Sequence, residues 1–412
     1  MSSVRPLGPS SEHTRSAILD LVRSSGTVSR IELAEMSGLT AASITRIIKS
    51  LIDAGLVVES GQADSTGGKR RSLLELNPHA RYAVGLSLDD ARLTYVLADL
   101  GGAVIGRFQS AGIGQIPPRR VIPRIARELR AFLQQRGVPE QDVVGVGVAG
   151  AGLDLSADAE RLSTSAEEWE SFPVQEELEA ALGLPVVHAN DAACAALGEF
   201  WAGRIPATQD FATLYMAAGF GLGLMVGGQL LRGASSNVGE IGHMVVQVDG
   251  PDCWCGSRGC LEMLAAPRAV VAAAMRHPDL VQDLELSGDD SHLRHDFVAV
   301  ARAAMAGRPV CLEIVERSAA LLAAAVLSVV NLLDLDRIHL AGPGFVEAGA
   351  LYARAIRDAL ERTARTRTVH HVVVELSDPE FDAAAVGAAS LALQHVLTPH
   401  TRPATAREPA QA

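Results

Sequence analysis

The sequence has no uninterrupted run of about 18 apolar residues, which is the length that a membrane-spanning helix needs. Its first eleven residues are polar and include Pro6 and Pro9, so they lack the apolar stretch of a secretory signal. Both absences predict a cytoplasmic protein. Hydrophobic residues make up 48% of the chain and charged residues 20%, as in folded globular proteins. At 412 residues, two or three domains are expected.

Lysine is also scarce, and the only two lysines of the chain, Lys49 and Lys69, lie near the N-terminus. Residues 1–81 contain ten Lys and Arg against eight Asp and Glu, whereas the whole chain contains 36 against 48. The N-terminal segment therefore has a slightly positive net charge, whereas the rest of the chain is acidic, and it can approach phosphates more easily. Drift of composition between two domains would give the same imbalance.

Three short helices are expected between His13 and Glu59, where apolar residues recur at helical spacing. The second opens at Ser29 with Glu32 three residues on, which is a capping box. The turn that follows, residues 38–40, begins with glycine and is short, as in a helix-turn-helix motif. The exposed face of the third helix would offer small hydrogen-bonding groups and cations to a DNA major groove: Ala42, Ser43, Thr45, Arg46 and Lys49. A plain three-helix bundle with a solvated face is the alternative.

A glycine-rich segment, residues 60–71, lies between two short strands expected near 56–59 and 72–76. It ends in three basic residues, Lys69, Arg70 and Arg71. This pattern is typical of a wing, a hairpin whose basic base reaches the phosphate backbone or a minor groove. We therefore predict a winged helix-turn-helix domain over residues 1–80, with double-stranded DNA as its partner.

From residue 82 onward strands alternate with helices, which predicts an α/β body. The expected strands lie near 82–88, 92–99, 103–109 and 142–148, and again near 211–217, 221–227 and 337–341. Long helices are expected near 121–136, 293–306 and 310–333. Two such sets predict two α/β lobes with a ligand cleft between them.

Cysteine is sparse, yet three of the five cysteines lie within eight residues: Cys253, Cys255 and Cys260. In a cytoplasmic chain such a cluster favours a metal over disulfides. With His243 it gives a tetrahedral set of three thiolates and one imidazole, which suits Zn²⁺ and leaves no open position for catalysis. We predict a structural zinc site; free thiols beside an unrelated histidine are the alternative.

The chain resembles the repressor branch of the ROK family (repressors, open reading frames and sugar kinases) from about residue 13 to residue 393. The most specific matches are Glu240-Ile241-Gly242-His243 and, ten residues on, residues 253–262, which read CWCGSRGCLE. Asn190-Asp191-Ala192-Ala193 stands before them. The resemblance implies a winged helix-turn-helix followed by a two-lobed, actin-like and hexokinase-like (ribonuclease H-like) ATPase fold.

The resemblance also implies the division of the body. A first lobe is expected over residues 81–189, completed by a helix near 384–396, and a second lobe over 190–383 would carry the zinc loop and a dimerisation surface. The Pro-, Thr- and Ala-rich tail, residues 397–412, is predicted to be disordered.

Five residues would lie at a bound sugar according to the resemblance: Asn190, Asp191, Glu240, His243 and Glu262. Carboxylates and amides suit this task because each ring hydroxyl both donates and accepts hydrogen bonds. In kinase members the residue that matches Asp191 is the base that deprotonates the sugar; in this chain it can remain as a hydrogen-bond partner only. The alternative to sugar binding is that these acids lie in a solvated loop and bind no ligand.

The nucleotide site departs from the kinase pattern. Kinase members have Asp-x-Gly-Gly-Thr where this chain reads Ser87-Leu88-Asp89-Asp90-Ala91, and Gly-Thr-Gly where it reads Ala217-Ala218-Gly219. A loop that closes on phosphate needs glycines and tolerates no extra negative charge. Two like charges about 4 Å apart repel by about 4 kcal/mol at an effective dielectric near 20. We therefore expect no kinase activity and no catalytic residues.

The sequence as a whole predicts a transcriptional regulator, a repressor of carbohydrate-metabolism genes, that senses a neutral sugar and acts as a homodimer or tetramer. Two alternatives stay open: an active sugar kinase with a DNA-binding head, and a regulator that answers to a non-sugar ligand or a partner protein. Ala149 replaces the proline of a family loop, and the sugar-binding Asn expected before Trp169 is missing, with Ser165 as a partial substitute. These departures keep the second alternative open.

Overall fold

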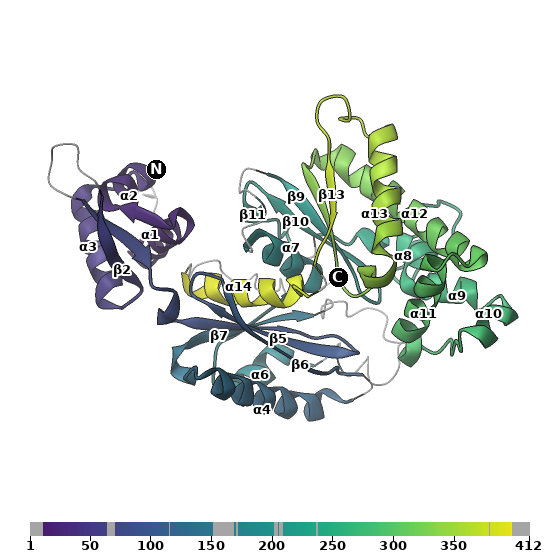
Figure 1. Ribbon diagram of the computed structural model, residues 1–412, viewed down its shortest axis with the longest axis horizontal. Helices are drawn as coiled ribbons and strands as arrows, with labels where there is room; N and C mark the ends of the chain where they lie inside the picture. The colour runs from purple at the N-terminus through teal and green to yellow at the C-terminus, as the bar shows by residue number, and fades with distance from the viewer. Residues whose placement is uncertain are drawn as a thin grey trace, which may run out of the picture.

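The computed structural model describes residues 11–63, 71–114, 116–150, 169, 172–201, 205, 209–235, 238–378 and 380–397. They form a small N-terminal head beside a larger body of two lobes (Figure 1). Within this part of the chain no helix is both long and apolar enough to cross a membrane. The predicted disordered tail lies outside the described residues from residue 398 onward.

The head contains the three predicted helices and a small sheet. The helices are α1 (Ser11–Ser25), α2 (Arg30–Ser37) and α3 (Ala41–Asp53). β2 (Val57–Ala63) and β3 (Arg71–Leu76) pair antiparallel as the arms of the wing, and β1 (Thr27–Ser29) pairs with the other side of β3. The sequence did not predict β1, because three residues are too few to show a period.

Side-chain caps begin both helices of the helix-turn-helix motif. The capping box of α2 is confirmed: the Ser29 backbone N–H donates to the Glu32 carboxylate at 2.7 Å, and the Glu32 N–H donates to Ser29 Oγ at 3.3 Å. Gly38 ends α2 in the left-handed conformation, with φ at 68°. Thr40 Oγ1 then accepts the Ser43 N–H at 3.3 Å and starts α3. The caps fix where each helix starts and stops, and so the angle between them.

The first lobe is built on a five-stranded sheet in the order β6-β5-β4-β7-β8. Its strands are β4 (Tyr82–Ser87), β5 (Arg92–Asp99), β6 (Val104–Ala111), β7 (Val143–Gly150) and β8 (Val186–Asn190). β4 is antiparallel to β5 and parallel to β7. Helices α4 (Pro118–Arg136) and α6 (Val174–Leu182) cover its outer face (Figure 1).

The second lobe repeats this topology with the order β11-β10-β9-β12-β13. Its strands are β9 (Phe211–Met216), β10 (Phe220–Val226), β11 (Gln229–Leu230), β12 (Arg337–Ala341) and β13 (Val373–Leu376). Its helices are α8 (Leu261–Ala265), α9 (Pro267–Ala274), α10 (Pro278–Asp283), α11 (Leu293–Met305), α12 (Pro309–Leu333) and α13 (Phe345–Thr363). In both sheets three antiparallel strands precede two parallel ones, which confirms the predicted two-lobed, actin-like fold.

The C-terminal helix α14 (Ala383–Leu397) packs on the inner face of the first sheet. Glycines make this contact backbone-to-backbone: a Cβ on Gly85 of β4 would overlap the Ala385 carbonyl oxygen, and one on Gly147 of β7 would overlap that of Ala388. The helix near 384–396 therefore belongs to the first sheet in space, although it follows the second lobe in sequence. The bounds of the predicted domains stay a prediction.

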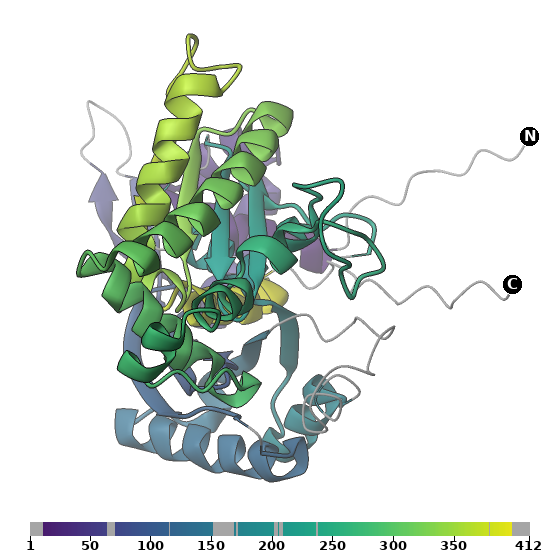
Figure 2. The same cartoon turned by 90° about the vertical axis from the view of Figure 1, so that its right-hand side faces the viewer.

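Between the two sheets, α14 packs along α7 (Asp191–Trp201) (Figures 1 and 2). A Cβ on Gly198 would overlap the Ala383 carbonyl oxygen, and one on Gly387 would overlap that of Cys194. The two helices thus meet through their main chains, with almost no side-chain layer between them. Such a contact leaves little room for one helix to slide without the other.

Candidate functional site

Two of the predicted sugar-binding residues form the junction between β8 and α7. Asn190 is the last residue of β8, and its Oδ1 accepts the N–H of Ala192 at 2.9 Å and of Ala193 at 3.3 Å. Asp191 is the first residue of α7, and its carboxylate accepts the Ala192 N–H at 2.7 Å. Both side chains therefore lie at the N-terminus of a helix, where the exposed N–H groups and the helix dipole favour negative charge.

Glu262, in the first turn of α8, reaches the turn between β9 and β10. Its Oε2 accepts the Phe220 N–H at 3.1 Å. Glycines make room for the carboxylate on two sides: a Cβ on Gly219 would lie 2.5 Å from Oε1, and one on Gly242 would lie 2.7 Å from Oε2. Gly219 and Gly242 therefore leave space for this acid.

The start of β10 lies close both to Asn190 and Asp191 and to Glu262. A Cβ on Gly221 would stand 3.8 Å from Asp191 Oδ1 and 4.0 Å from Asn190 Oδ1, one residue after the N–H that binds Glu262. Glu240 and His243 flank a single turn of 3-10 helix, in which the His243 N–H donates to the Glu240 carbonyl oxygen at 3.0 Å.

Burial and neighbouring charges change the acidity of this cluster. Desolvation raises the pKa of Asp191 to about 6; the Ala192 N–H opposes this, and the charges of Asp89 and Glu240 add to it. Desolvation also raises the pKa of Glu262 to about 7, against the opposing Phe220 N–H and the Arg268 charge, while Glu240 raises it further. The charge of Glu240 acts on both carboxyl groups, as it would from a position between them. Perturbed acids in a cleft are typical of functional sites.

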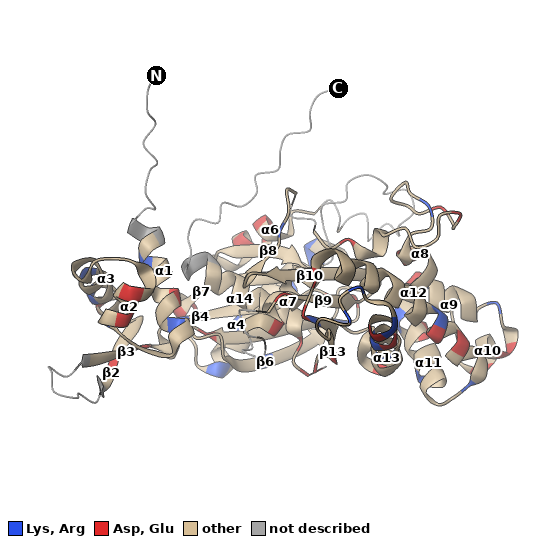
Figure 3. Ribbon diagram, turned by 90° about the horizontal axis from the view of Figure 1, so that it is seen from above, with Lys and Arg blue, Asp and Glu red and all other residues tan. Residues whose placement is uncertain are grey.

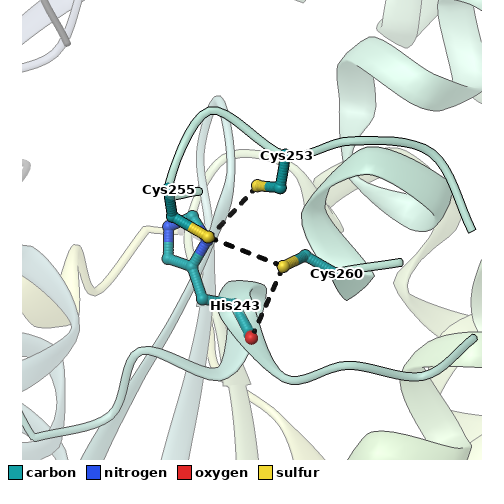
Figure 4. Close-up of side chains that lie close together, drawn as sticks. All are labelled: His243, Cys253, Cys255 and Cys260. Carbon is teal, nitrogen blue, oxygen red and sulfur yellow. Dashed lines mark hydrogen bonds between the residues drawn. The ribbon is translucent and has the colours of Figure 1, made fainter. Parts of the chain in front are cut away.

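His243 and the three cysteines come together as the sequence predicts (Figure 4). One ligand atom from each lies within 4.8 Å of all the others. Cys253 Sγ is 3.6 Å from His243 Nδ1, and Cys255 Sγ is 3.7 Å from Cys260 Sγ. Ligands at about 2.3 Å (sulfur) and 2.0 Å (nitrogen) from a tetrahedral zinc would stand about 3.5–3.8 Å apart. These two distances match that spacing, and the other donor pairs are at most 4.8 Å apart, so the four donors could hold a metal ion.

Main-chain hydrogen bonds fix the loop that holds these thiols. The Cys253 N–H donates to the Ser257 carbonyl oxygen at 2.8 Å, and the Leu261 N–H donates to that of Met244 at 2.9 Å. A Cβ on Gly259, which has φ at 67°, would overlap the Gln247 carbonyl oxygen, so only glycine fits there. The loop leads directly into α8, and it thereby links the metal-binding set to Glu262.

Helix α3, which carries five of the predicted DNA-reading residues, lies at one end of the molecule (Figure 3). Four of them are exposed: Ala42, Thr45, Arg46 and Lys49. Ser43 is half-buried and belongs to the cap of α3, because its Oγ accepts the Thr40 hydroxyl at 3.0 Å. Lys69 and Arg70 lie outside the described residues, and Arg71 is the first residue of β3.

In the loop between β4 and β5, where kinase members bind phosphate, the side chain of Asp89 occupies the hydrogen-bond donors. Asp89 Oδ1 accepts the Ala91 N–H at 3.0 Å and Arg294 Nη1 at 2.8 Å. Arg294 belongs to α11 of the second lobe, so this ion pair bridges the cleft. The sequence did not reveal the partner, because 205 residues separate the two and no spacing signal links them.

The ion pair changes the expected electrostatics of this loop. Arg294 compensates the charge of Asp89, so repulsion of a phosphate is smaller than two free aspartates would cause. Desolvation and the Asp89 charge raise the pKa of the neighbouring Asp90. A cavity of about 150 Å³ lies beside the pair, with Tyr215, Gly342 and Asp382 in its wall.

The residue that many kinase members place before Trp169 cannot be located, because Ser165 and its neighbours lie outside the described residues. Trp169 itself is buried, and its Nε1 donates to the Ile116 carbonyl oxygen at 3.1 Å. Its ring packs edge-on against Phe172.

A winged helix-turn-helix head on a duplicated, kinase-type body, with an acid and amide cluster at one helix start, defines a class of DNA-binding regulator. The model of the ROK family matches residues 100–395, and a model described as winged helix-turn-helix DNA-binding matches residues 12–58. This chain belongs to the ROK family, and it is a transcriptional regulator that carries its DNA-binding domain at the N-terminus.

Three proteins illustrate the likeness. A xylose repressor of Caldicellulosiruptor bescii is 23% identical over 92% of this chain and 95% of its own length. The crystal structure of a ROK transcriptional regulator, homologous to the Escherichia coli MLC protein, has a TM-score of 0.71 at 23% identity and covers 94% of this chain and 97% of its own. A Streptomyces griseus ROK glucokinase, solved with glucose and AMPPNP, has a TM-score of 0.61 at 26% identity, over 76% of this chain and 99% of its own.

The raised pKa of Asp191 predicts a pH-dependent penalty on stability. A folded-state pKa near 6 means that ionisation opposes folding: the penalty is absent below about pH 4, grows between about pH 4 and 6, and is complete above. The Asp191→Asn variant removes the ionisation. Its free energy of unfolding minus that of the wild type should therefore rise across this range, by at most about 3 kcal/mol.

Urea unfolding at several pH values between 4 and 8 measures this difference. The exposed Asp279→Asn on α10 is the matched control and should give a flat difference. A flat difference for Asp191→Asn as well would contradict the assigned acidity.

Proposed function

We propose that the chain is a repressor of carbohydrate-metabolism genes whose body senses a neutral sugar and whose head binds operator DNA. The observation that supports this most is the meeting of Asn190, Asp191 and Glu262 around the start of β10. These are the side chains that hydroxyl groups need as partners. The name of the Caldicellulosiruptor bescii relative, a xylose repressor, and the glucose in the glucokinase structure point to the same ligand class.

The chemistry of the cluster favours an uncharged sugar. Negative charge shared among Asp191, Glu240 and Glu262 would repel the phosphate of a sugar phosphate, whereas these carboxyl groups can hydrogen-bond to neutral hydroxyls. His243 turns Nδ1 toward Cys253, which leaves Nε2 for a hydroxyl of the sugar. The histidine would then serve the metal through one ring nitrogen and the ligand through the other.

The head would bind DNA as one half of a homodimer, either alone or as part of a tetramer. The operator would have two half-sites. Arg46 and Lys49 on the exposed face of α3 would meet the major groove, with Ala42, Ser43 and Thr45 nearby. Lys69, Arg70 and Arg71 would bring the wing to the phosphate backbone. The relatives are DNA-binding regulators of bacteria, whose DNA lies in the cytoplasm, so we expect the protein to act there.

The first test combines DNA and sugar. A duplex selected by the protein from a random-sequence library is titrated by fluorescence anisotropy with and without D-xylose, D-glucose, N-acetyl-D-glucosamine or D-glucose 6-phosphate. One of the neutral sugars should change the DNA affinity by about 5- to 150-fold, the usual range of coupling between two sites. The sugar phosphate should have no effect.

Variants on α3 provide the controls for that titration. Arg46→Ala and Lys49→Ala should each lower the salt dependence of DNA binding by about one ion, whereas Ser50→Ala on the same helix should not. A DNA affinity that no sugar alters would reject the sensor. Normal DNA binding by the Arg46→Ala/Lys49→Ala double variant would reject the assignment of α3.

We further propose that the body does not use ATP. The carboxylate of Asp89 takes up the Ala91 N–H and Arg294, the donors that a phosphate would otherwise bind. The loop also lacks the two glycines and the hydroxyl of the kinase pattern. A bound anion would have to displace an ion pair that already bridges the cleft.

Calorimetry with Mg²⁺ and AMPPNP measures whether the protein binds nucleotide. The wild type should give no binding heat at about 1 mM nucleotide, and Asp89→Gly should gain affinity because it frees both donors. Asp283→Gly, which frees Arg308 at the surface, is the matched control and should gain none. Wild-type sugar phosphorylation faster than about 1 s⁻¹, an ordinary enzyme rate, would overturn the proposal.

The Cys₃His set would hold one structural Zn²⁺. Cys253, Cys255, Cys260 and His243 would be its four ligands, and a closed tetrahedral site of this kind contributes folding energy instead of chemistry. The metal would hold the loop from which Glu262 extends.

Metal analysis of the purified protein should find one zinc per chain. Cys260→Ser should lose the zinc and lower the melting temperature, because three ligands seldom hold a structural zinc. Cys311→Ser, which alters a buried thiol on α12, should keep the zinc. Full zinc content in Cys260→Ser would contradict the assignment.

A further inference from the structure

Helix α7 runs from the candidate sugar site to the DNA-binding head. Its first residue is Asp191, and Asn190 just before it caps its first N–H groups. Its last residue is Trp201, ten residues further on, about 15 Å along the helix axis. A ligand that hydrogen-bonds to Asn190 or Asp191 therefore acts on the cap of the helix that ends at Trp201.

The Trp201 ring is held between the body and the head. On one side, Gly102, with φ at 90°, leaves no room for a side chain, since a Cβ there would lie 2.9 Å from Trp201 Cε3. The guanidinium of Arg23, from α1 of the head, lies 4.0 Å from the ring centroid. Asp20 orients that guanidinium, because its Oδ1 accepts both Nε and Nη2 of Arg23 at 2.9 Å.

A cation over an indole face is an attractive contact, and it is stronger when it is shielded from water. The Arg23 side chain is only 18% exposed. The contact therefore fastens the end of α7 to α1, and it joins two segments that lie far apart in sequence.

A second contact ties the same head helix to α14. Ile18, Leu19 and Val22 of α1 share one buried apolar cluster with residues of α14, namely Ala389, Ala392 and Leu393. Since α14 meets α7 main chain to main chain, α1 rests on a pair of helices with little room to shift separately. Ala192, the residue after Asp191, is packed just as closely, because a Cβ on Gly223 of β10 would overlap its carbonyl oxygen.

We propose that α7 transmits sugar binding to the DNA-binding head and so acts as a relay. A displacement of its N-terminus at Asn190 and Asp191 would move Trp201 at its C-terminus, and through the contact of Trp201 with Arg23 it would move α1 of the head. The proposal rests on the proposed function, because it specifies how that sugar site controls DNA binding. A ligand can shift the head only if it binds one arrangement better than the other. The relay locates that difference in the placement of α1, which sets where α3 meets each half-site.

The test compares coupling ratios, each being the dissociation constant for the selected duplex with saturating sugar divided by that without sugar. The probe is whichever of D-xylose, D-glucose and N-acetyl-D-glucosamine alters DNA binding by the wild type. Arg23→Met removes the cation but keeps a long apolar side chain, and Trp201→Phe keeps an aromatic ring of smaller area. Each should move the ratio toward one by about 2- to 30-fold, the range that one cation–π contact can supply.

Arg30→Met is the matched control. It removes the same charge from the head, but Arg30 pairs with Glu59 inside the head, at 2.8 Å, and not with the body. Any general effect of the lost charge on DNA affinity cancels from the ratio, so this variant should keep the wild-type value. Circular dichroism and calorimetry with sugar alone establish that each variant is folded and still binds its ligand.

The outcomes separate the relay from the function on which it rests. Suppose that the wild-type coupling ratio differs from one. If the ratios of Arg23→Met and Trp201→Phe then lie within twofold of the wild-type ratio, the relay is overturned and the sensor stays intact. A wild-type ratio of one with every sugar would reject the sensor itself, before any variant is made. A loss of coupling in Arg30→Met equal to that in Arg23→Met would also overturn the relay, since the charge alone would then account for it.

Discussion

The main-chain packing of α7 against α14 is the contact on which the rest of the structure depends. Gly198 and Gly387 bring the two helices so close that a single methyl group at either position would overlap a carbonyl oxygen. Interiors packed to this density transmit displacement instead of absorbing it. Through α14 the pair is joined to the first sheet and the head, and through α7 to the candidate sugar site. One contact therefore connects that candidate site to the DNA-binding head.

The site itself combines two opposing demands. Neutral hydroxyls need several acceptors close together, but acids that are brought together and desolvated resist ionisation, as the raised pKa values of Asp191 and Glu262 indicate. Main-chain N–H groups of Ala192 and Phe220 offset part of this cost. The closely spaced Cys₃His set lies in the loop that leads to Glu262. Under the proposed function, stability is given up at this cluster in exchange for binding a polar ligand.

Sequence patterns predicted what local chemistry encodes. The capping box at Ser29 and Glu32, seven of the ten strands of the two sheets and the clustering of His243 with three cysteines follow from spacing and residue type, and each is present. Contacts between distant segments could not be predicted, because nothing in the spacing of Asp89 and Arg294 or of Arg23 and Trp201 marks them as partners. The short strand β1 was missed because its pairing with β3, not its composition, defines it.

Hydrogen–deuterium exchange across the whole chain, with and without a neutral sugar that binds in calorimetry, tests most directly whether the sugar site and the head are mechanically connected. The account predicts altered amide protection at the start of α7 and also in α1, although α1 lies in the head and contacts no predicted sugar ligand. Altered protection confined to the β8–α7 junction, the β10 turn and α8, with α1 unchanged, would contradict it.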